Sequence, residues 1–406
     1  MKQGWEIKKL GDAMHIARGG SPRPIKKYIT DDPNGINWIK IGDASDSSKY
    51  IYKTKQKINK DGLHKTRFVE EGDFLLSNSM SFGRPYIMKT NGCIHDGWLV
   101  LKENNTTILD KDFLYYLLCS PYIFEQFDSL AAGSTVRNLN ISLVSSVEIP
   151  IPPLDEQKRI VAKLDECFEA VDKARANVEK NLNNAKELFQ SQLNQIFSQK
   201  GDGWVEKKLG EVCEFENGDR GKNYPSRSKF VSEGIPFVNA GHLDNGKVII
   251  ENLNYITQEN YNLLSRGKFS IGDILFCLRG SLGKYAMIDS LERGAIASSL
   301  VIVRVTKELI NNFLFYYFDS PICIKMIEEY AGGTAQPNLG AKDLAKFNIS
   351  YPPLDEQKRT VAKLDALYSQ TQSLESNYQQ ELDALDELKK SILQKAFSGE
   401  LTIDNG

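Results

Sequence analysis

Two stretches of the chain carry an apolar residue at every third or fourth position for far longer than the rest of the sequence. They cover residues 155–200 and 355–399 and contain neither Pro nor Gly up to Phe197 and Phe397. A period of about 3.5 residues predicts two amphipathic α-helices, each of about 43 residues or roughly 65 Å. The expected apolar stripes are Ile160, Leu164, Cys167, Val171, Ala174, Val178, Leu182, Ala185, Phe189 and Ile196, and Leu364, Leu367, Thr371, Leu374, Tyr378, Leu382, Leu385, Leu388, Ile392 and Ala396.

The ends of both stretches carry matching signals. A proline and then an acidic pair stand at each start, and a glycine follows each end: Pro153, Asp155, Glu156 and Gly201, and Pro353, Asp355, Glu356 and Gly399. We expect the aspartates to be N-caps and the glutamates to be favoured by the helix dipole. The glycines are expected to end the helices.

The remaining sequence has short β-branched and aromatic runs separated by Gly, Asn and Asp, which is typical of strands and turns. Helical spacing also occurs twice there. The predicted strands are Ile36–Ile41, a run at Phe237 with Val248–Ile250, and Ser299–Val305, and the predicted helices are Asp112–Phe127 and Asn312–Tyr330.

The chain repeats itself. Residues 152–165 (PPLDEQKRIVAKLD) and 352–365 (PPLDEQKRTVAKLD) are identical at 13 of 14 positions. Weaker matches keep the same order: GWEIKKLGD with GWVEKKLGE, GDFLLSNSMSFGRPYIM with GDILFCLRGSLGKYAMI, and DFLYYLLCSP with NFLFYYFDSP. The sequence therefore consists of two tandem copies of one unit, each a mixed part followed by a long helix.

Such a long helix cannot bury its stripe within its own small domain, so we expect the two helices to pack on each other. A pseudo-two-fold relation between the copies would make them antiparallel, with the mixed parts at opposite ends. The expected fold class is α+β, with mixed α/β domains at 1–154 and 203–354 and long coiled-coil helices at 155–202 and 355–406. The alternative is that each helix binds a different protein.

Composition and charge narrow the function only a little. The chain is 41% hydrophobic and 26% charged, which is globular, and its net charge of −2 neither favours nor excludes nucleic acid. Segment charges are +3 for 1–154, −1 for 155–202, zero for 203–354 and −4 for 355–406. No apolar run is long enough to cross a bilayer, and the first residues lack an apolar signal core, so a cytoplasmic location is expected.

The common signatures of catalysis are missing. We find no Walker A sequence, no G-x-S-x-G elbow, no H-E-x-x-H and no amino-methyltransferase tetrapeptide. The six cysteines form no C-x-x-C pair and are expected to be small buried hydrophobes. We predict a chain without catalytic residues, metal or cofactor of its own.

Basic residues gather in Gly/Ser/Pro-rich loops at matching places in the two copies. They are Arg18, Arg23, Lys26 and Lys27 with Tyr28, and Arg220, Lys222, Arg227 and Lys229 with Tyr224. Such clusters suit nucleic acid, although a solvated surface loop would have the same composition.

The duplicated PPLDEQKR-x-VAKLD segment, opening a long helix after each of two variable domains, resembles the specificity subunit of type I DNA restriction-modification systems. The resemblance covers the whole chain. It implies that 1–154 and 203–354 are target recognition domains, each for one half of a bipartite asymmetric DNA sequence. It also implies that the helices at 155–202 and 355–406 set the spacing and dock two modification subunits.

The resemblance assigns the chemistry to other chains. Modification subunits would bind S-adenosylmethionine and methylate adenine, and restriction subunits bound through the methyltransferase would use ATP and Mg²⁺. The partners of this chain would be double-stranded DNA and those subunits, with no membrane. Inserting four residues in one helix would lengthen it by about 6 Å and change the gap in the target by a base pair or two.

Base recognition requires hydrogen-bonding side chains, typically Arg for guanine and Asn or Gln for adenine. Our candidate loops are 18–27, 77–84 and 134–138 in the first domain, and 220–229, 279–284 and 334–338 in the second. The candidate DNA-binding residues are Arg18, Arg23, Lys26, Lys27, Arg84, Arg137, Arg220, Lys222, Arg227, Arg279, Lys284 and Gln336. Two alternatives remain: a non-catalytic coiled-coil scaffold with two protein-binding domains, and the recognition subunit of a restriction-methyltransferase outside type I.

Overall fold

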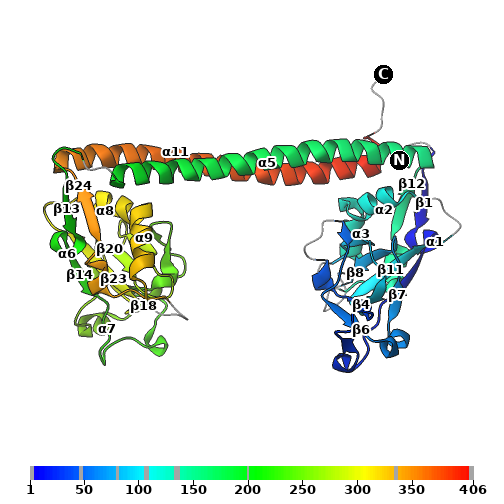
Figure 1. The fold of residues 1–406 in the computed structure, drawn as a ribbon, viewed down its shortest axis with the longest axis horizontal. Helices are drawn as coiled ribbons and strands as arrows, with labels where there is room; N and C mark the ends of the chain where they lie inside the picture. Colours follow the sequence, from blue (N-terminus) through cyan, green and yellow to red (C-terminus); the bar gives the residue numbers. More distant parts are fainter. Residues whose placement is uncertain are drawn as a thin grey trace, which may run out of the picture. The chain divides into compact units, whose positions relative to one another are not determined.

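A computed structural model describes residues 4–44, 49–78, 82–104, 109–131, 138–198, 201–332 and 337–401 (Figure 1). Internal contacts divide the chain into unit 1, Met1–Val178 with Gln380–Gly406, and unit 2, Glu179–Gln379. Each unit therefore combines one globular part with a segment of each long helix. We call the globular parts head 1 (residues 6–151) and head 2 (residues 205–351).

A central sheet with apolar side chains on both faces forms the middle of head 1. Its strand order is β2-β11-β8-β9-β5, with β2 Met14–Arg18, β11 Trp98–Glu103, β8 Phe74–Ser77, β9 Pro85–Met88 and β5 Tyr50–Ile51. Side chains alternate between the faces. Phe74 and Leu76 pack with Phe113 of a helix layer, whereas Leu75 packs with Ile94 of a second sheet.

The layers on either side of that sheet complete head 1. The second sheet has the order β3-β6-β4-β10-β7, with β3 Ile29–Thr30, β6 Gln56–Ile58, β4 Ile36–Ile39, β10 Gly92–Ile94 and β7 Arg67–Val69. The helices are α1 Leu10–Ala13, α2 Lys111–Leu118, α3 Pro121–Ala131 and α4 Ile141–Ser146, with short 3-10 turns η1 Ile25–Lys27, η2 Ile41–Asp43 and η3 Lys60–Lys65. Antiparallel strands β1 Glu6–Lys9 and β12 Glu148–Ile151 join the two ends of the head.

Head 2 repeats this arrangement. Its central sheet has the order β14-β23-β20-β21, with β14 Cys213–Asn217, β23 Leu300–Val305, β20 Ile274–Cys277 and β21 Tyr285–Met287. Its second sheet has the order β18-β15-β22-β19, with β18 Asn254–Ile256, β15 Ile235–Val238, β22 Arg293–Ile296 and β19 Lys268–Ser270. Two further strand pairs are β13 Val205–Lys208 with β24 Asn348–Tyr351, and β16 Leu243–Asp244 with β17 Lys247–Val248. The helices of head 2 are α6 Leu209–Val212, α7 Gln258–Leu263, α8 Asn311–Phe318, α9 Pro321–Tyr330 and α10 Ala341–Leu344. Its 3-10 turns are η4 Arg227–Lys229 and η5 Ala240–His242.

The two shorter helices predicted from the sequence are wrong in their continuity. Each is a pair of helices, α2 with α3 and α8 with α9, separated by a Ser-Pro step. Pro121 and Pro321 lack the N–H that a continuous helix requires, and each starts the second helix instead. Ser320 caps that start, because its side chain accepts from the N–H of Cys323 at 3.3 Å.

The predicted strands are found with shorter bounds. The first stops at Ile39 in β4 and the chain turns into η2, while Ser299–Val305 becomes β23 from Leu300. Val248 ends β17, and Ile250 beyond it is 47% exposed. Four of the six cysteines are buried as expected, whereas Cys167 is half-buried and Cys119 is an exposed residue.

The two long helices are α5 Leu154–Ser198 and α11 Leu354–Ser398, as the apolar period predicts. Asp155 and Asp355 are not N-caps but lie inside the first turn, one residue past each helix start. The carbonyl of Pro153 accepts from the N–H groups of Glu156 and Gln157, so Pro153 is the residue that directly precedes the helix and accepts its first hydrogen bonds. Gly399 ends α11 with φ +85°, whereas α5 ends at Ser198, before Gly201.

Within each unit the segments of α5 and α11 run antiparallel. In unit 1, Arg175 pairs with Asp386 and Asp172 pairs with Lys389, so residue numbers rise along one helix as they fall along the other. In unit 2, the rings of Phe189 and Tyr368 lie 5.6 Å apart. Each pair of segments also closes the core of its head, through Leu393, Ala396 and Phe397 in head 1 and Phe189, Leu193 and Phe197 in head 2.

The predicted stripes are wrong at two leucines of α11. Leu374 is 42% exposed and Leu388 is 45% exposed. The half-buried neighbours Glu375 and Lys389 take the inward positions there, so the leucines point away. No helix among the described residues has the length and apolarity needed to cross a bilayer.

Candidate nucleic-acid interface

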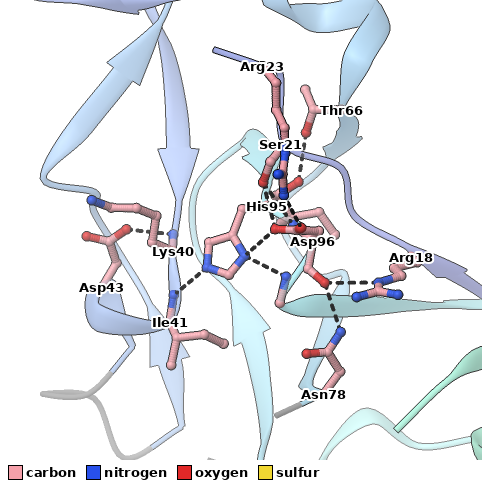
Figure 2. A network of polar contacts seen from close by, with 12 residues as sticks. Arg18, Ser21, Arg23, Lys40, Ile41, Asp43, Thr66, Asn78, His95 and Asp96 are labelled. Atoms are coloured by element: carbon pink, nitrogen blue, oxygen red, sulfur yellow. Dashed lines mark hydrogen bonds and ion pairs between the residues drawn. The ribbon is translucent and has the colours of Figure 1, made fainter. Parts of the chain in front are cut away.

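In head 1, three arginines meet at the turn between β10 and β11. Arg18, at the end of β2, donates through Nε to the carbonyl oxygen of Asp96 at 3.0 Å. The exposed guanidinium of Arg23 lies 3.7 Å from the Asp96 carboxylate (Figure 2). Arg67, from β7, donates to the carbonyl oxygen of Arg18 at 2.9 Å. The fold therefore concentrates positive charge at one turn, from residues distant in sequence.

Asp96 is the centre of this arrangement (Figure 2). The hydroxyl of Ser21 donates to its carboxylate at 2.7 Å, and this bond contributes most to holding the pKa of Asp96 below its usual value. The amide of Asn78, at the end of β8, donates to the Asp96 carbonyl at 2.8 Å. The carboxylate stays ionised and half-exposed, and it orients the neighbouring Arg23.

The ring of His95 supports the same turn from inside. Burial lowers its pKa, so the imidazole is neutral at pH 7. Its Nδ1 accepts from the N–H of Gly97 at 2.6 Å, while Nε2 lies 3.2 Å from the N–H of Ile41 in η2 (Figure 2). A neutral imidazole has one acceptor nitrogen, so the shorter contact with Gly97 is the hydrogen bond.

Head 2 builds an equivalent turn with different residues. Ser298 precedes β23 as Asp96 precedes β11, and its carbonyl accepts from Arg279 at 2.9 Å and from Arg220 at 3.3 Å. Next to Arg220, the Asp219 carboxylate accepts from the N–H groups of Gly221 and Ser265 at 2.7 and 2.8 Å. These bonds lower the pKa of Asp219 to about 2. Both heads thus place an arginine on the backbone carbonyl two residues before the central strand β11 or β23, with at least one further arginine close by.

The other candidates divide into three groups. Lys26 and Lys27 in η1, Lys222, and Arg227 in η4 are exposed on the loops that lead to these turns. Arg84 and Lys284 lie directly before β9 and β21. Arg137 and Gln336 lie outside the described residues.

Arg84 follows β8 in head 1 and Lys284 follows β20 in head 2, each in the hairpin to the next strand. Their side chains contact residues other than those of the arginine turns. The guanidinium of Arg84 lies 5.4 Å from the centre of the Tyr86 ring. The amine of Lys284 donates to the Leu243 carbonyl at 3.1 Å and lines a cavity of about 560 Å³ with residues of the long helices. The sequence neighbours Arg279 and Lys284 therefore belong to different surfaces of head 2.

A second duplicated site explains much of the repeated motif. Gln157 and Gln357 are fully buried where each long helix leaves its head. Gln157 accepts from the Asp110 N–H at 2.7 Å and donates to the Pro152 carbonyl at 2.9 Å. Gln357 accepts from Ile310 at 3.0 Å and donates to the carbonyls of Pro352 at 2.8 Å and Glu308 at 2.9 Å.

Tyrosine–aspartate hydrogen bonds reinforce the same junctions. Tyr116 donates to Asp165 at 2.5 Å, and Tyr316 donates to Asp365 at 2.6 Å. Burial and these carboxylates raise the pKa of both phenols above the usual value, so the hydroxyls remain donors. The long helix is thus fixed to its own head in both units.

Sequence reasoning missed Arg67, Asp96 and Ser298. No motif marks them: Arg67 is a single arginine in a strand, and the pairing of β7 with β10 brings it to the turn. Within the described residues, no group of His, Cys, Asp and Glu is arranged to hold a metal.

Two similar α+β heads, each fixed to a long helix and each bearing an arginine turn, define a protein with two copies of one binding module. The family described as type I restriction modification DNA specificity domain matches the chain twice, at residues 2–184 and 201–384. The chain belongs to this family.

Relatives of known function resemble the chain along nearly its whole length. The type I restriction enzyme MjaIX specificity subunit of Methanocaldococcus jannaschii is 26% identical, covering 98% of this chain and 94% of its own. The EcoBI specificity subunit of Escherichia coli is 25% identical, covering 93% of this chain and 90% of its own.

Solved structures share the fold. A chain from a study of complex assembly and conformational transition in the type I R-M system has a TM-score of 0.78 at 23% identity, covering 98% of this chain and 99% of its own. The HsdS subunit from Thermoanaerobacter tengcongensis has a TM-score of 0.56 at 23% identity, covering 98% of both chains.

Proposed function

We propose that this chain is the specificity subunit of a type I restriction-modification complex and has no catalytic centre of its own. The observation that carries the proposal is the pair of arginine turns at the same place in two heads that share a fold but differ in sequence. Equivalent turns with different side chains suit two half-sites of different sequence. The chain would act in the cytoplasm, where its DNA target is found.

Each head recognises one half of a bipartite, asymmetric target. Residues 1–154 form the first recognition domain and 203–354 the second, with the spacer helices at 155–202 and 355–406. Arg18, Arg23 and Arg67 supply donors to guanine edges and phosphates in the first half-site. Arg220 and Arg279 do so in the second, while the exposed lysines of both loops contact phosphates.

The helices keep the half-sites at a fixed separation and dock two modification subunits. Some identical positions of the duplicated motif serve the junctions described above, but others do not. Lys158, Arg159 and Lys163 are exposed, and so are their counterparts Lys358, Arg359 and Lys363. Identical exposed surfaces suit two copies of one partner, which would supply S-adenosylmethionine-dependent adenine methylation. Restriction subunits, with ATP and Mg²⁺, would join through that methyltransferase.

The recognition part is tested with Arg279→Ala in the assembled methyltransferase. Loss of a bidentate base contact costs about 1–3 kcal/mol, so methylation should become weaker and less selective in one half-site only. Lys247→Ala, an exposed change in β17 of the same head, is the control and should leave the target unchanged. Unaltered methylation at every site in Arg279→Ala and Arg220→Ala would remove the head 2 turn from the interface.

The docking part is tested by reversing charges in one copy or both. Lys158→Glu with Arg159→Glu should reduce the bound modification subunits from two to one, and adding Lys358→Glu and Arg359→Glu should remove both. Native mass spectrometry counts the subunits, with the exposed, unduplicated Lys173→Glu as the control. Two bound subunits in every variant would contradict this surface.

The same complex separates the proposal from a protein-binding scaffold. A scaffold with its partners would leave DNA unmethylated, whereas the proposed subunit directs methylation to one split sequence.

A further inference from the structure

The C-terminal ends of the two long helices present the same apolar side chains to the two heads. Leu393 and Phe397 are buried in head 1, and Leu193 and Phe197, 200 residues earlier, are buried in head 2. The Phe397 ring lies 5.4 Å from Phe113, and the Phe197 ring lies 5.1 Å from its counterpart Phe313. These contacts do not distinguish the end of α5 from the end of α11. A second copy of the chain could therefore offer an equally good apolar helix end.

The charges along the helix pair do distinguish the two helices. In unit 1, Arg175 of α5 pairs with Asp386 of α11. The counterparts of these positions in unit 2 are Glu375 of α11 and Lys186 of α5, which line the same cavity. The sign at each position is thus reversed between the copies, so unlike charges form an ion pair in unit 1 and line one cavity in unit 2.

Pairing between two chains would reverse this outcome. If α5 packed against α5 of a second copy in the same register, Arg175 would face Lys186. If α11 packed against α11, Glu375 would face Asp386. Asp172, which pairs with Lys389 in unit 1, would face Phe189 and lose its partner. The arrangement within one chain therefore keeps the ion pairs Arg175–Asp386 and Asp172–Lys389, whereas pairing of like helices would lose both and bring like charges together.

We propose that Arg175, Lys186, Glu375 and Asp386 direct α5 to pair with α11 of the same chain and exclude a second copy of the chain from this surface. The apolar contacts supply most of the stability of the helix pair but are common to both arrangements. Partly exposed charge pairs are individually weak, and they decide the outcome because they differ between the arrangements. The charges thus favour pairing of α5 with α11 of the same chain over pairing of like helices from two chains.

The test converts the charge pattern in the full-length chain. Arg175→Glu with Glu375→Arg makes both contacts within a chain repulsive and all four contacts between like helices attractive. Two monomers together have four repulsive contacts and the dimer has four attractive ones, so eight contacts change in all. At about a twofold change in equilibrium constant for each contact, they shift the monomer–dimer equilibrium by about a hundredfold or more. Wild type and variant are refolded from denaturant over a range of concentrations, and molar mass is measured by light scattering. The wild type should be monomeric and the variant dimeric.

Two further variants keep the test decisive. Lys186→Glu with Asp386→Arg changes the other member of each pair and should also dimerise. The variant with all four substitutions restores unlike charges within the chain and should return to a monomer, although it carries the same intrahelical changes. Monomers in both double variants would overturn the proposal, as would dimers of the fourfold variant. Loss of folding in both double variants with a folded fourfold variant would mean that the charges stabilise the pair without selecting its partner, which also overturns it.

Discussion

Replacing Gln357 by leucine should release α11 from head 2. The side chain is fully buried and makes three hydrogen bonds to backbone groups: the Ile310 N–H and the carbonyls of Glu308 and Pro352. Leucine has a similar volume but can make none of them. The Pro352 carbonyl is buried and would lose its partner, which costs about 1–3 kcal/mol, while the other two bonds contribute about 1 kcal/mol each. We expect a loss of about 3–5 kcal/mol in unit 2.

The assay is denaturation of the full chain, combined with hydrogen exchange at the start of α11. A loss of about 3 kcal/mol in a unit of this size lowers the melting temperature by roughly 6–12 °C. Exchange should rise at the helix start and in α8. Gln370→Leu changes an exposed glutamine of the same helix and is the matched control. If the two variants unfolded within 1 kcal/mol of each other, the buried glutamine would not be what fixes the helix to the head.

Three other changes have defined outcomes. Burial lowers the pKa of His95 in the folded protein, so the neutral ring stabilises the turn at pH values above the ordinary histidine pKa. That stabilisation is lost as the pH falls from the ordinary pKa through the lower pKa of the folded state, so the DNA affinity of the complex, measured by fluorescence anisotropy, should fall from pH 7 to pH 5. The fall should be smaller in His95→Asn, which keeps an acceptor but does not titrate. Tyr316→Phe removes the 2.6 Å bond to Asp365 and should lower the free energy of unfolding by about 1 kcal/mol in urea titrations, whereas no change would show that the bond is replaced by water. Inserting four residues in both α5 and α11 lengthens the pair by about 6 Å and should widen the unread gap in the methylated target by about two base pairs; an unchanged gap would contradict the spacer role.

The large-scale organisation was predictable because it depends on long patterns. The duplicated segment at 152–165 and 352–365 and the long apolar period define two copies and two long helices without any contact information. Apolar spacing alone failed where polar residues occupy inward positions, as at Glu375 and Lys389. It also merged α2 with α3, because the helical spacing continues across the Ser-Pro step even though the backbone does not.

The candidate interface was predictable only where its residues are close in sequence. Arg18 ends strand β2 and Arg23 lies in the loop that follows it, and Arg220 follows the matching strand of head 2. Arg67 and Asp96 come together only through sheet pairing between β7 and β10, which no local pattern reveals. Conversely, Arg279 and Lys284 are neighbours in sequence but separate in space, because the hairpin that follows β20 turns the lysine toward the long helices.

The most direct test of the central claim is a base-resolution map of modified adenines in cells that express this chain with its modification subunit. The account predicts one split and asymmetric motif, with a modified adenine in each half and a fixed unread gap between the halves. Modification of a continuous sequence, or the same sequence in both halves, would contradict two different heads recognising two different half-sites.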